Sequence, residues 1–419
     1  MSSPSPGLNE PSLGWSVSDG ARTPYKVFTD RGIYEEEQRR IFRGPSWSFL
    51  ALAGELRNPG DYKSTFIGDM PVVVTFDKDG AYHAWVNRCA HRGAQVCRNN
   101  RGNAAEFVCI YHQWLYDPKG NLVGAPFTRG LKGMPGMPAD FDRKNHGLQK
   151  LRVETYGGMI FATFDFEAES LFDYLGAEMR PWVDRVFHKP VEYLGCLRQF
   201  VHANWKLYFE NVKDPYHGSL LHMFLNTFNV ARANMTGRTI VDARHGLHSI
   251  LNAAPNSQSG SADIYKQNDV RSYKEGSRLN DTAVLDVRNE FEDRIVTSIQ
   301  SIFPSLVIQQ INNTLACRQL LPKGPDEFEL VFHLFGYADD DPELRAMRLL
   351  QANLIGPAGF ISMEDSEVTE LVQRAIAPDA GYESLVHMGR GAGESNSANL
   401  ITEELIRRFW VGYRAIMEA

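Results

Sequence analysis

Two stretches decide the fold of this chain: NRCAHRGAQVC at residues 87–97 and CIYHQWLYDPKGNLVGAPF at residues 109–127. The first contains Cys89-x-His91, and after 17 intervening residues the second begins with Cys109-x-x-His112. A two-iron cluster of mixed ligation needs two thiolates on one iron and two imidazoles on the other. Because each motif supplies one thiolate and one imidazole, two short loops can close over such a cluster from opposite sides.

The alternative for these four residues is a structural zinc site. Zinc fingers usually group two Cys in one loop and two His in another, at C-x2–4-C and H-x3–5-H spacing. Here each half carries one residue of each kind. The grouping therefore favours an iron–sulfur centre of the Rieske type.

The size and composition of the chain are those of a globular protein. Its 419 residues, 43% hydrophobic and 23% charged, predict two or three domains. A net charge of −7 without basic runs argues against binding to nucleic acid or to a membrane surface. Five cysteines fit a reducing compartment, and no signal peptide or run of 18 apolar residues is present. We expect a soluble, cytoplasmic protein.

The chain shows no Rossmann fingerprint and no P-loop. A one-electron carrier without a nicotinamide or flavin site must take its electrons from a separate protein.

The pattern of the chain predicts an α+β protein in three parts. Residues 1–44 form an N-terminal arm (1–25), which is expected to be mobile, and an amphipathic helix (28–43) that packs with the catalytic domain. Residues 45–160 are β-rich and hold the cluster. Residues 161–419 form a mixed catalytic domain in which helices flank an antiparallel sheet.

Several segments of the third part have a predicted structure of their own. Residues 254–282 are polar and indicate a surface loop or a lid. The stretches 305–321 and 327–337 predict strands, and the pair Asp341-Pro342 predicts the start of a helix that runs to about residue 353. The last segment, residues 401–417, has the apolar stripe of a packed helix.

A second candidate metal site lies in NWKLYFENVKDPYHGSLLHMF, residues 204–224. Asp214 and His217 are three apart, so the carboxylate can hold one imidazole nitrogen while the other faces a metal. His217 and His222 are five apart, about 140° around an ideal helix, so both reach one metal only if the helix breaks. Pro215 and Gly218 predict such a break. Two satisfied core histidines are the alternative.

The third ligand is expected from GPAGFISMEDSEVTELVQ, residues 356–373, because two His and one carboxylate leave coordination positions open. The candidates are Glu364, Asp365 and Glu367. Asp365 shares a helical stripe with Val368 and Val372, where an unpaired carboxylate is costly. Alternatively, Ser362-x-x-Asp365 is a capping box that makes Asp365 a helix-start residue.

From about residue 25 to its end, the chain resembles the α subunit of Rieske non-haem iron ring-hydroxylating oxygenases. The resemblance rests on the two Cys-His stretches, on N-W-K…E-N…D-x-x-H-x4-H and on the later E-D pair. It implies a list of functional residues: a [2Fe-2S] cluster at Cys89, His91, Cys109 and His112, and one Fe2+ at His217, His222 and Asp365. The segment E-N-V-K-D is one residue shorter than in naphthalene-type relatives, so pocket residues are not transferred from them.

The same resemblance implies how electrons reach the iron. An aspartate matching Asp214 bridges the iron site to a Rieske histidine of the neighbouring chain, here the partner subunit's His112. This implies a trimeric ring, as α3 or as α3β3 with a small β subunit. Electrons come from NADH through a reductase, directly or with a ferredoxin.

Within the family the similarity is to terephthalate dioxygenases and salicylate 5-hydroxylases, through NWKLYFENVKD, LLHMF, RQLLPK and NLIGPAGFISMED. These act on aromatic carboxylates. Arg318 shares one face of a predicted strand with Ala316 and Leu320, where its guanidinium needs an anion. That anion is either the substrate carboxylate or an internal Asp or Glu.

Residues 394–400 contain no Arg or Lys, so the position near Leu400 offers no second cation for a dicarboxylate such as terephthalate. We therefore expect cis-dihydroxylation by O2 of a benzoate with one carboxylate, such as anthranilate, salicylate or a 2-halobenzoate. The alternatives are a terephthalate 1,2-dioxygenase or a salicylate-type ring monohydroxylase. In a different class, the chain is a Rieske electron carrier or a zinc-binding module.

Overall fold

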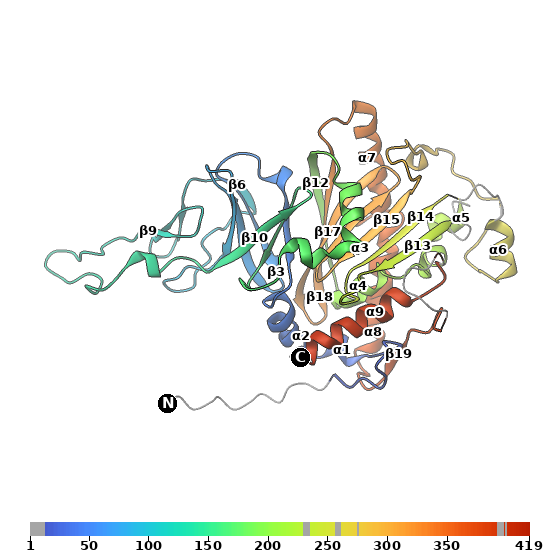
Figure 1. The fold of residues 1–419 in the computed structure, drawn as a ribbon, viewed down its shortest axis with the longest axis horizontal. Helices are drawn as coiled ribbons and strands as arrows, with labels where there is room; N and C mark the ends of the chain where they lie inside the picture. Colours follow the sequence, from blue (N-terminus) through green and yellow to red (C-terminus); the bar gives the residue numbers. More distant parts are fainter. Residues whose placement is uncertain (1–12, 229–234, 256–260, 275, 392–397, 399) are drawn as a thin grey trace.

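The computed structural model describes residues 13–228, 235–255, 261–274, 276–391, 398 and 400–419. Two seven-stranded antiparallel sheets follow one another along the long axis of the molecule (Figure 1). Helices lie mainly around the second sheet. The predicted α+β class is confirmed.

The first sheet has the strand order β2-β11-β10-β5-β4-β3-β6. Its strands are Ser48–Leu52 (β2), Asp61–Ile67 (β3), Met70–Phe76 (β4), Tyr82–Val86 (β5), Arg101–Asn103 (β6), Lys150–Tyr156 (β10) and Met159–Thr163 (β11). The run Val72–Val74 in β4 is fully buried, as expected for a β-branched central strand. The expected boundary after residue 160 falls inside β11, and the three-part division stays a prediction.

A small three-stranded sheet extends this end of the molecule (Figure 1). It consists of Phe107–Val108 (β7), Leu115–Tyr116 (β8) and Leu122–Gly124 (β9). The loop with Cys89 follows β5, and the loop with Cys109 joins β7 to β8.

The second sheet has the order β12-β18-β17-β16-β15-β14-β13. Its strands are Val191–Val201 (β12), Thr236–Val241 (β13), Ser249–Ala254 (β14), Thr297–Ile302 (β15), Leu306–Ile311 (β16), Thr314–Gly324 (β17) and Glu327–Tyr337 (β18). Alternation along β17 separates its two faces: Leu315 and Cys317 pack with the helix Leu171–Val186 (α3), and Leu320 packs on the other side.

The face opposite α3 is covered by helices that position the candidate site. They are Trp205–Asn211 (α4), Met223–Thr227 (α5), Pro342–Ile355 (α7), Ser362–Ile376 (α8) and Glu404–Met417 (α9). The predicted strand 327–337 and the helix capped by Asp341 are confirmed. The stretch 305–321 is not one strand but a hairpin, β16–β17, which turns at Asn312 with φ +50°.

Two other expectations were wrong. The helix predicted over 28–43 is broken at Asp30, whose carboxylate caps Ile33, into Lys26–Thr29 (α1), Arg31–Glu37 (α2) and a π-helical turn, Gln38–Phe42. The arm is packed from residue 13 onward: Trp15 contacts Trp410, and Arg22–Pro24 (β1) pairs with Glu383–Leu385 (β19). The first 12 residues lie outside the described part.

The polar segment 254–282 also contains a helix, Ser261–Gln267 (α6), instead of loop alone. Ser272 donates its hydroxyl to the Leu220 carbonyl, so this segment packs against the candidate metal segment. Within the described residues, no helix is both long and apolar enough to cross a bilayer.

A buried ion pair joins the N-terminal helices to the rest of the chain. Lys206 Nζ lies 2.6 Å from Glu37 Oε1, both side chains are fully buried, and Trp205 Nε1 donates to Glu37 Oε2 at 3.0 Å. We expect Glu37→Ala to lower the free energy of unfolding by about 3–5 kcal/mol, because it leaves the Lys206 ammonium buried and unpaired. Denaturant unfolding followed by circular dichroism measures this.

The double variant Glu37→Leu/Lys206→Met is the control, because replacing both charges by apolar groups is often nearly neutral. If both variants lose the same stability, packing and not the charge explains the loss.

Candidate active site

The two Cys-His loops meet at the narrow end of the molecule. Cys89 and Cys109 are buried, whereas His91 is exposed and His112 partly exposed. The two imidazole centroids lie 4.5 Å apart. Two inner thiols and two outer imidazoles are the donor set of a Rieske cluster, so these residues fit that group.

The packing around these loops orders them. The Trp114 ring stacks on His91 at 4.8 Å with an interplanar angle of 6°. The Tyr116 hydroxyl lies 3.2 Å from Cys89 Sγ. Burial is the main reason why the pKa of the Cys109 thiol is raised, and the nearby Cys89 thiol contributes. Bound iron would remove this cost by holding both sulfurs as thiolates.

The segment with the two histidines is a broken helix, as predicted. Helix α4 ends at Asn211, a single 3-10 turn spans His217–Ser219, and α5 starts after His222. The break brings both imidazoles to one point, with ring centroids 5.3 Å apart.

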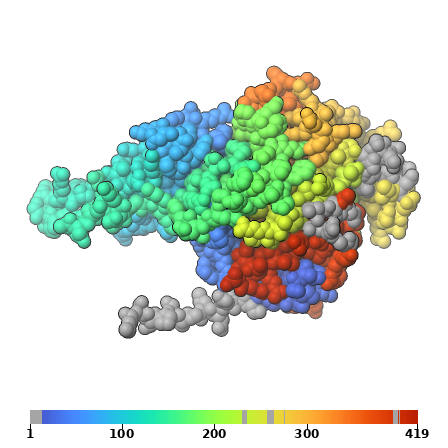
Figure 2. Space-filling model, in the orientation of Figure 1, coloured from blue at the N-terminus to red at the C-terminus, as the bar shows by residue number. Residues whose placement is uncertain are grey.

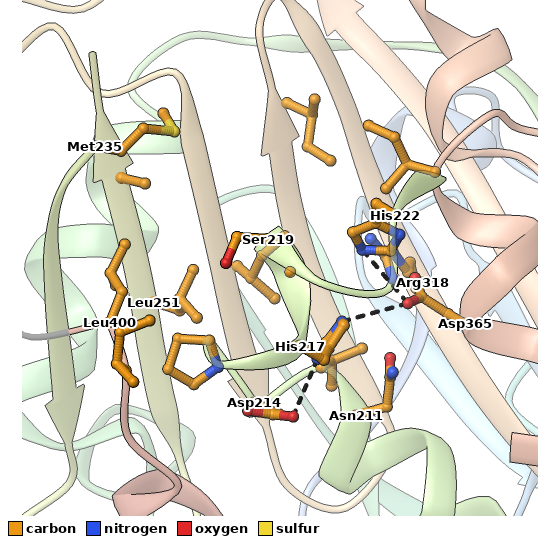
Figure 3. Close-up of a pocket in the computed structure, with 18 of the residues that line it drawn as sticks. Asn211, Asp214, His217, Ser219, His222, Met235, Leu251, Arg318, Asp365 and Leu400 are labelled. Carbon is orange, nitrogen blue, oxygen red and sulfur yellow. Dashed lines mark ion pairs between the residues drawn. The ribbon is translucent and has the colours of Figure 1, made fainter. Parts of the chain in front are cut away.

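Asp365 in the first turn of α8 completes this group. His217, His222 and Asp365 each offer one ligand atom within 4.8 Å of the others. His217 Nε2 and His222 Nε2 lie 3.4 and 3.6 Å from Asp365 Oδ1 (Figure 3). That buried oxygen makes no hydrogen bond within the described residues. A cation bound between the three side chains would satisfy it.

The expected capping role of Asp365 is not observed. The helix has Ile361 at its N-cap and no side-chain cap. The expected stripe was also wrong: Val368 is partly exposed, Val372 is exposed, and the buried face of α8 is polar, with Asp365, Thr369 and Gln373. Asp365 on this face lines the site, whereas Gln373 accepts from the Asn204 amide and donates to the Phe28 carbonyl.

Each imidazole also contacts a carboxylate of its own through the ring nitrogen that faces away from Asp365. His217 Nδ1 lies 3.2 Å from Asp214 Oδ2, and His222 Nδ1 lies 3.2 Å from Glu364 Oε2. Burial lowers the pKa of His217, but Asp214 and Asp365 together more than offset it and raise the value to about 10. The site therefore attracts positive charge. This arrangement turns both Nε2 atoms toward one point, as metal-binding histidines require.

Sequence reasoning did not find the role of Glu364, which it named only as a candidate ligand. Its Oε1 also accepts from the Met223 amide at 3.0 Å, so it joins α8 to the start of α5 across 141 positions of the chain. Its adjacency to Asp365 was the only signal available. Glu367, the third candidate, is exposed.

We expect Glu364→Gln to weaken iron binding about 10- to 100-fold, because a neutral amide holds the His222 ring less firmly. Titration of iron-free protein with Fe2+ measures this independently of activity. Glu367→Gln is the matched control on the same helix. Equal iron affinity in the two variants would contradict the role of Glu364.

A cavity of about 200 Å³ opens beside the three residues. A cavity of roughly 150 Å³ is already enough to hold benzene, so this one fits a single substituted ring. Figure 3 shows its two ends. Arg318 lies with His222 and Asp365, whereas Met235, Leu251 and Leu400 lie at the other end.

Arg318 is buried, with 3% of its surface exposed, and is the one arginine or lysine among the described lining residues. Its Nε donates to Gln309 Oε1 at 2.5 Å and its Nη1 donates to the Tyr208 hydroxyl at 2.7 Å. No carboxylate in the described part of the chain pairs with it. The nearest internal anion shown is Asp365: Arg318 helps to lower the pKa of this carboxyl, but Asp365 is not within ion-pair distance of Arg318 and faces the two histidines.

Comparisons with known proteins identify the family. Residues 46–135 match the Rieske [2Fe-2S] domain, and residues 178–419, more than half of the chain, match the catalytic domain of the ring hydroxylating alpha subunit. The chain belongs to the ring-hydroxylating alpha-subunit family. This alpha subunit is therefore an oxidoreductase with a Rieske [2Fe-2S] domain, and the resemblance inferred from its motifs is confirmed.

Relatives of the alpha subunit cover nearly its whole length. It is 61% identical to the anthranilate 1,2-dioxygenase large subunit of Burkholderia cepacia, over 95% of this chain and 94% of that protein. It is 44% identical to the terephthalate 1,2-dioxygenase terminal oxygenase component subunit alpha 2 of a Comamonas species, over 98% of each. A naphthalene 1,2-dioxygenase structure from a Rhodococcus species superposes with a TM-score of 0.79 at 23% identity, over 94% of each chain, which shows the fold.

Proposed function

We propose that this alpha subunit is the terminal oxygenase that dihydroxylates a benzoate with one carboxylate and an ortho substituent, with anthranilate as the first candidate. Buried Arg318 carries the proposal. It is held by Gln309 and Tyr208, forms no ion pair within the described residues, and lines the same cavity as His217, His222 and Asp365. The 61% identical relative named for anthranilate supports it.

The donor sets define which groups the chain would hold. Cys89, His91, Cys109 and His112 would hold the [2Fe-2S] cluster. His217, His222 and Asp365 would hold one Fe2+, because two imidazoles and a carboxylate leave positions free. When bound, these groups would supply electrons singly and activate O2.

The protein's own residues would then bind and orient the ring. The Arg318 guanidinium would hold the carboxylate, so that the ring carbons next to it face the histidine end of the cavity. The apolar walls Leu251, Ala253 and Ile299 would exclude water from the ring. Asp214 and Glu364 would keep the two imidazoles oriented.

The reaction balances for anthranilate. Both atoms of O2 enter the ring at the carbons that carry the carboxylate and the amino group. NADH supplies two electrons and one proton, and the medium supplies two further protons. Loss of CO2 and ammonia from the diol then gives catechol.

The proposed assembly is a trimeric ring of alpha subunits with a small β subunit. Asp214 and His217 line both the ring-binding cavity and a second cavity that also includes Leu221 and Leu385. We place the partner subunit's His112 at this second cavity. The narrow extension of the Rieske domain (Figure 2) exposes Phe127 and Met134 by 71% and 70%, as expected of a surface covered by another protein.

The electron donor is proposed to be an NADH-dependent reductase, with or without a ferredoxin, because the chain carries no nucleotide motif. None of the five cysteines forms a disulfide, which supports a cytoplasmic location.

A substrate panel tests the proposal. Alpha subunit purified with its β subunit is supplied with reductase and NADH, and oxygen uptake is measured with anthranilate, salicylate, 2-chlorobenzoate, terephthalate and aniline. We expect uptake coupled to product with the monocarboxylates, and catechol from anthranilate by mass spectrometry. Preferential turnover of terephthalate or aniline would contradict the proposal.

A further inference from the structure

We propose that Gln309 and Tyr208 are positioning residues that hold the Arg318 guanidinium with neutral partners and so leave its charge for the substrate carboxylate. The inference rests on the proposed function and says how that site selects an anionic ring. The two residues come from different elements, β16 and α4.

The geometry fixes the guanidinium from two sides. Gln309 lies on β16 two residues after Val307, which is paired with Arg318 on β17, so Gln309 and Arg318 share one face of the hairpin. Its Oε1 accepts from Arg318 Nε, and the Tyr208 hydroxyl accepts from Nη1. Both holders are fully buried. Burial raises the pKa of Tyr208 to about 12, so its hydroxyl is neutral at physiological pH.

Two other buried cations of the described chain have carboxylate partners within ion-pair distance. Arg348 pairs with Asp340 and Glu290, and Lys206 pairs with Glu37. Arg318 has none in the described part of the chain. The two acidic residues that line the cavity, Asp214 and Asp365, each face a histidine.

Lys213 is a second buried cation whose ammonium contacts only neutral groups, the Leu247 carbonyl and the Ser249 hydroxyl. It differs in one respect: burial lowers the pKa of Lys213 to about 7, so it can lose its charge. An arginine stays charged in a protein. Arg318 is thus a permanent buried charge that forms no ion pair within the described residues, although Asp365 is near enough for Arg318 to lower its pKa.

The surroundings of Arg318 are also rich in donors. Gln309 Nε2 is buried and has no hydrogen-bond partner within the described residues. No hydrogen bond of the described chain uses Arg318 Nη2. A carboxylate has two oxygens and only accepts hydrogen bonds. The carboxylate of a bound ring would therefore accept from Gln309 Nε2 and Arg318 Nη2 together.

The test inserts the missing anion into the protein. Gln309→Glu is nearly isosteric and places a carboxylate on Arg318 Nε. We expect the affinity of the holoenzyme for anthranilate and benzoate to fall at least about tenfold, since Arg318 is then neutralised. Affinity for the neutral analogue benzamide should not fall. Calorimetric titration without oxygen, with the cluster oxidised, gives these dissociation constants.

Two other variants complete the set. Gln310→Glu makes the same change at the next residue, which lies on the opposite face of β16 beside Arg185. This variant should leave anthranilate binding unchanged. Gln309→Met removes the hold on Arg318 without adding charge. It should weaken anthranilate binding by a smaller factor and raise the KM for anthranilate more than it lowers kcat. Iron content and the visible spectrum of the cluster should match those of the wild type in each.

The outcomes separate the inference from the proposed function. If the wild type binds no monocarboxylated benzoate, the proposed function fails. If the wild type binds them and Gln309→Glu binds them equally well, the inference is overturned. An equal loss of anthranilate and benzamide binding in Gln309→Glu and in Gln309→Met would show general damage to the cavity and would also overturn it.

Discussion

The double variant His217→Ala/His222→Ala is expected to lose oxygen uptake entirely and to keep the visible spectrum of the cluster. The two imidazoles are two of the three donor groups that lie within 4.8 Å of one another, so their loss leaves Asp365 alone to bind iron. The Cys-His loops belong to the other end of the molecule (Figure 1) and are not disturbed. Metal analysis measures the iron content, absorption spectroscopy measures the cluster spectrum, and an oxygen electrode measures oxygen uptake.

His202→Ala is the matched control, because this imidazole is 72% exposed. It should retain full iron content and full uptake. Unchanged uptake in the double variant would rule out the proposed site. Loss of the cluster spectrum together with the iron would instead mean that the protein had unfolded, and thermal unfolding curves distinguish that case.

A histidine elsewhere in the chain shows what a structural imidazole looks like. His248 is buried, accepts from the Phe303 amide at 3.0 Å and contacts the Tyr174 carbonyl at 2.9 Å, so backbone groups satisfy both of its ring nitrogens. His217 and His222 instead face carboxylates with both nitrogens. Sequence alone could not separate these two environments, because each depends on contacts between distant segments.

Local patterns predicted the parts of the fold that depend on near neighbours. The strand Glu327–Tyr337 and the helix capped by Asp341 follow from alternation and from a cap followed by proline. The break in the helix between Asn211 and His222 follows from Pro215 and from the spacing of the two histidines. These signals lie within a few residues of the feature that they predict.

Features that depend on distant segments were missed. Trp15 is ordered by Trp410, at the other end of the chain, although its own stretch is rich in Ser, Pro and Gly. The polar buried face of α8 has the wrong pattern for a core helix, because Asp365 lines the site and Gln373 contacts the backbone of Asn204 and Phe28. Glu364 acts through a contact with α5 that no local spacing shows.

The partner of Arg318 was likewise open from sequence, since a substrate carboxylate and an internal one satisfy a buried guanidinium equally well. The structure shows Gln309 and Tyr208 in contact with it, and in the described part of the chain no acidic side chain lies within ion-pair distance of it. This difference affects the free energy of binding a substrate carboxylate, because neutral partners orient the guanidinium without cancelling its charge.

We therefore expect Arg318→Gln to raise the KM for anthranilate about 100- to 4,000-fold. A substrate carboxylate enclosed in the cavity without its cation costs about 3–5 kcal/mol, and each 1.4 kcal/mol corresponds to a factor of ten. Iron content and the cluster spectrum should not change, because Arg318 is not a metal ligand. Initial rates of oxygen uptake against anthranilate concentration give KM and kcat.

Comparing the change in KM for a ring with a carboxylate and for a neutral ring makes this prediction specific to charge. The KM for benzamide should rise much less than the KM for anthranilate, because benzamide brings no charge to the guanidinium. Arg318→Lys should fall between wild type and Arg318→Gln, since an ammonium keeps the charge but loses the planar two-point geometry. An equal rise in KM for both rings would mean that Arg318 shapes the cavity instead of binding the carboxylate.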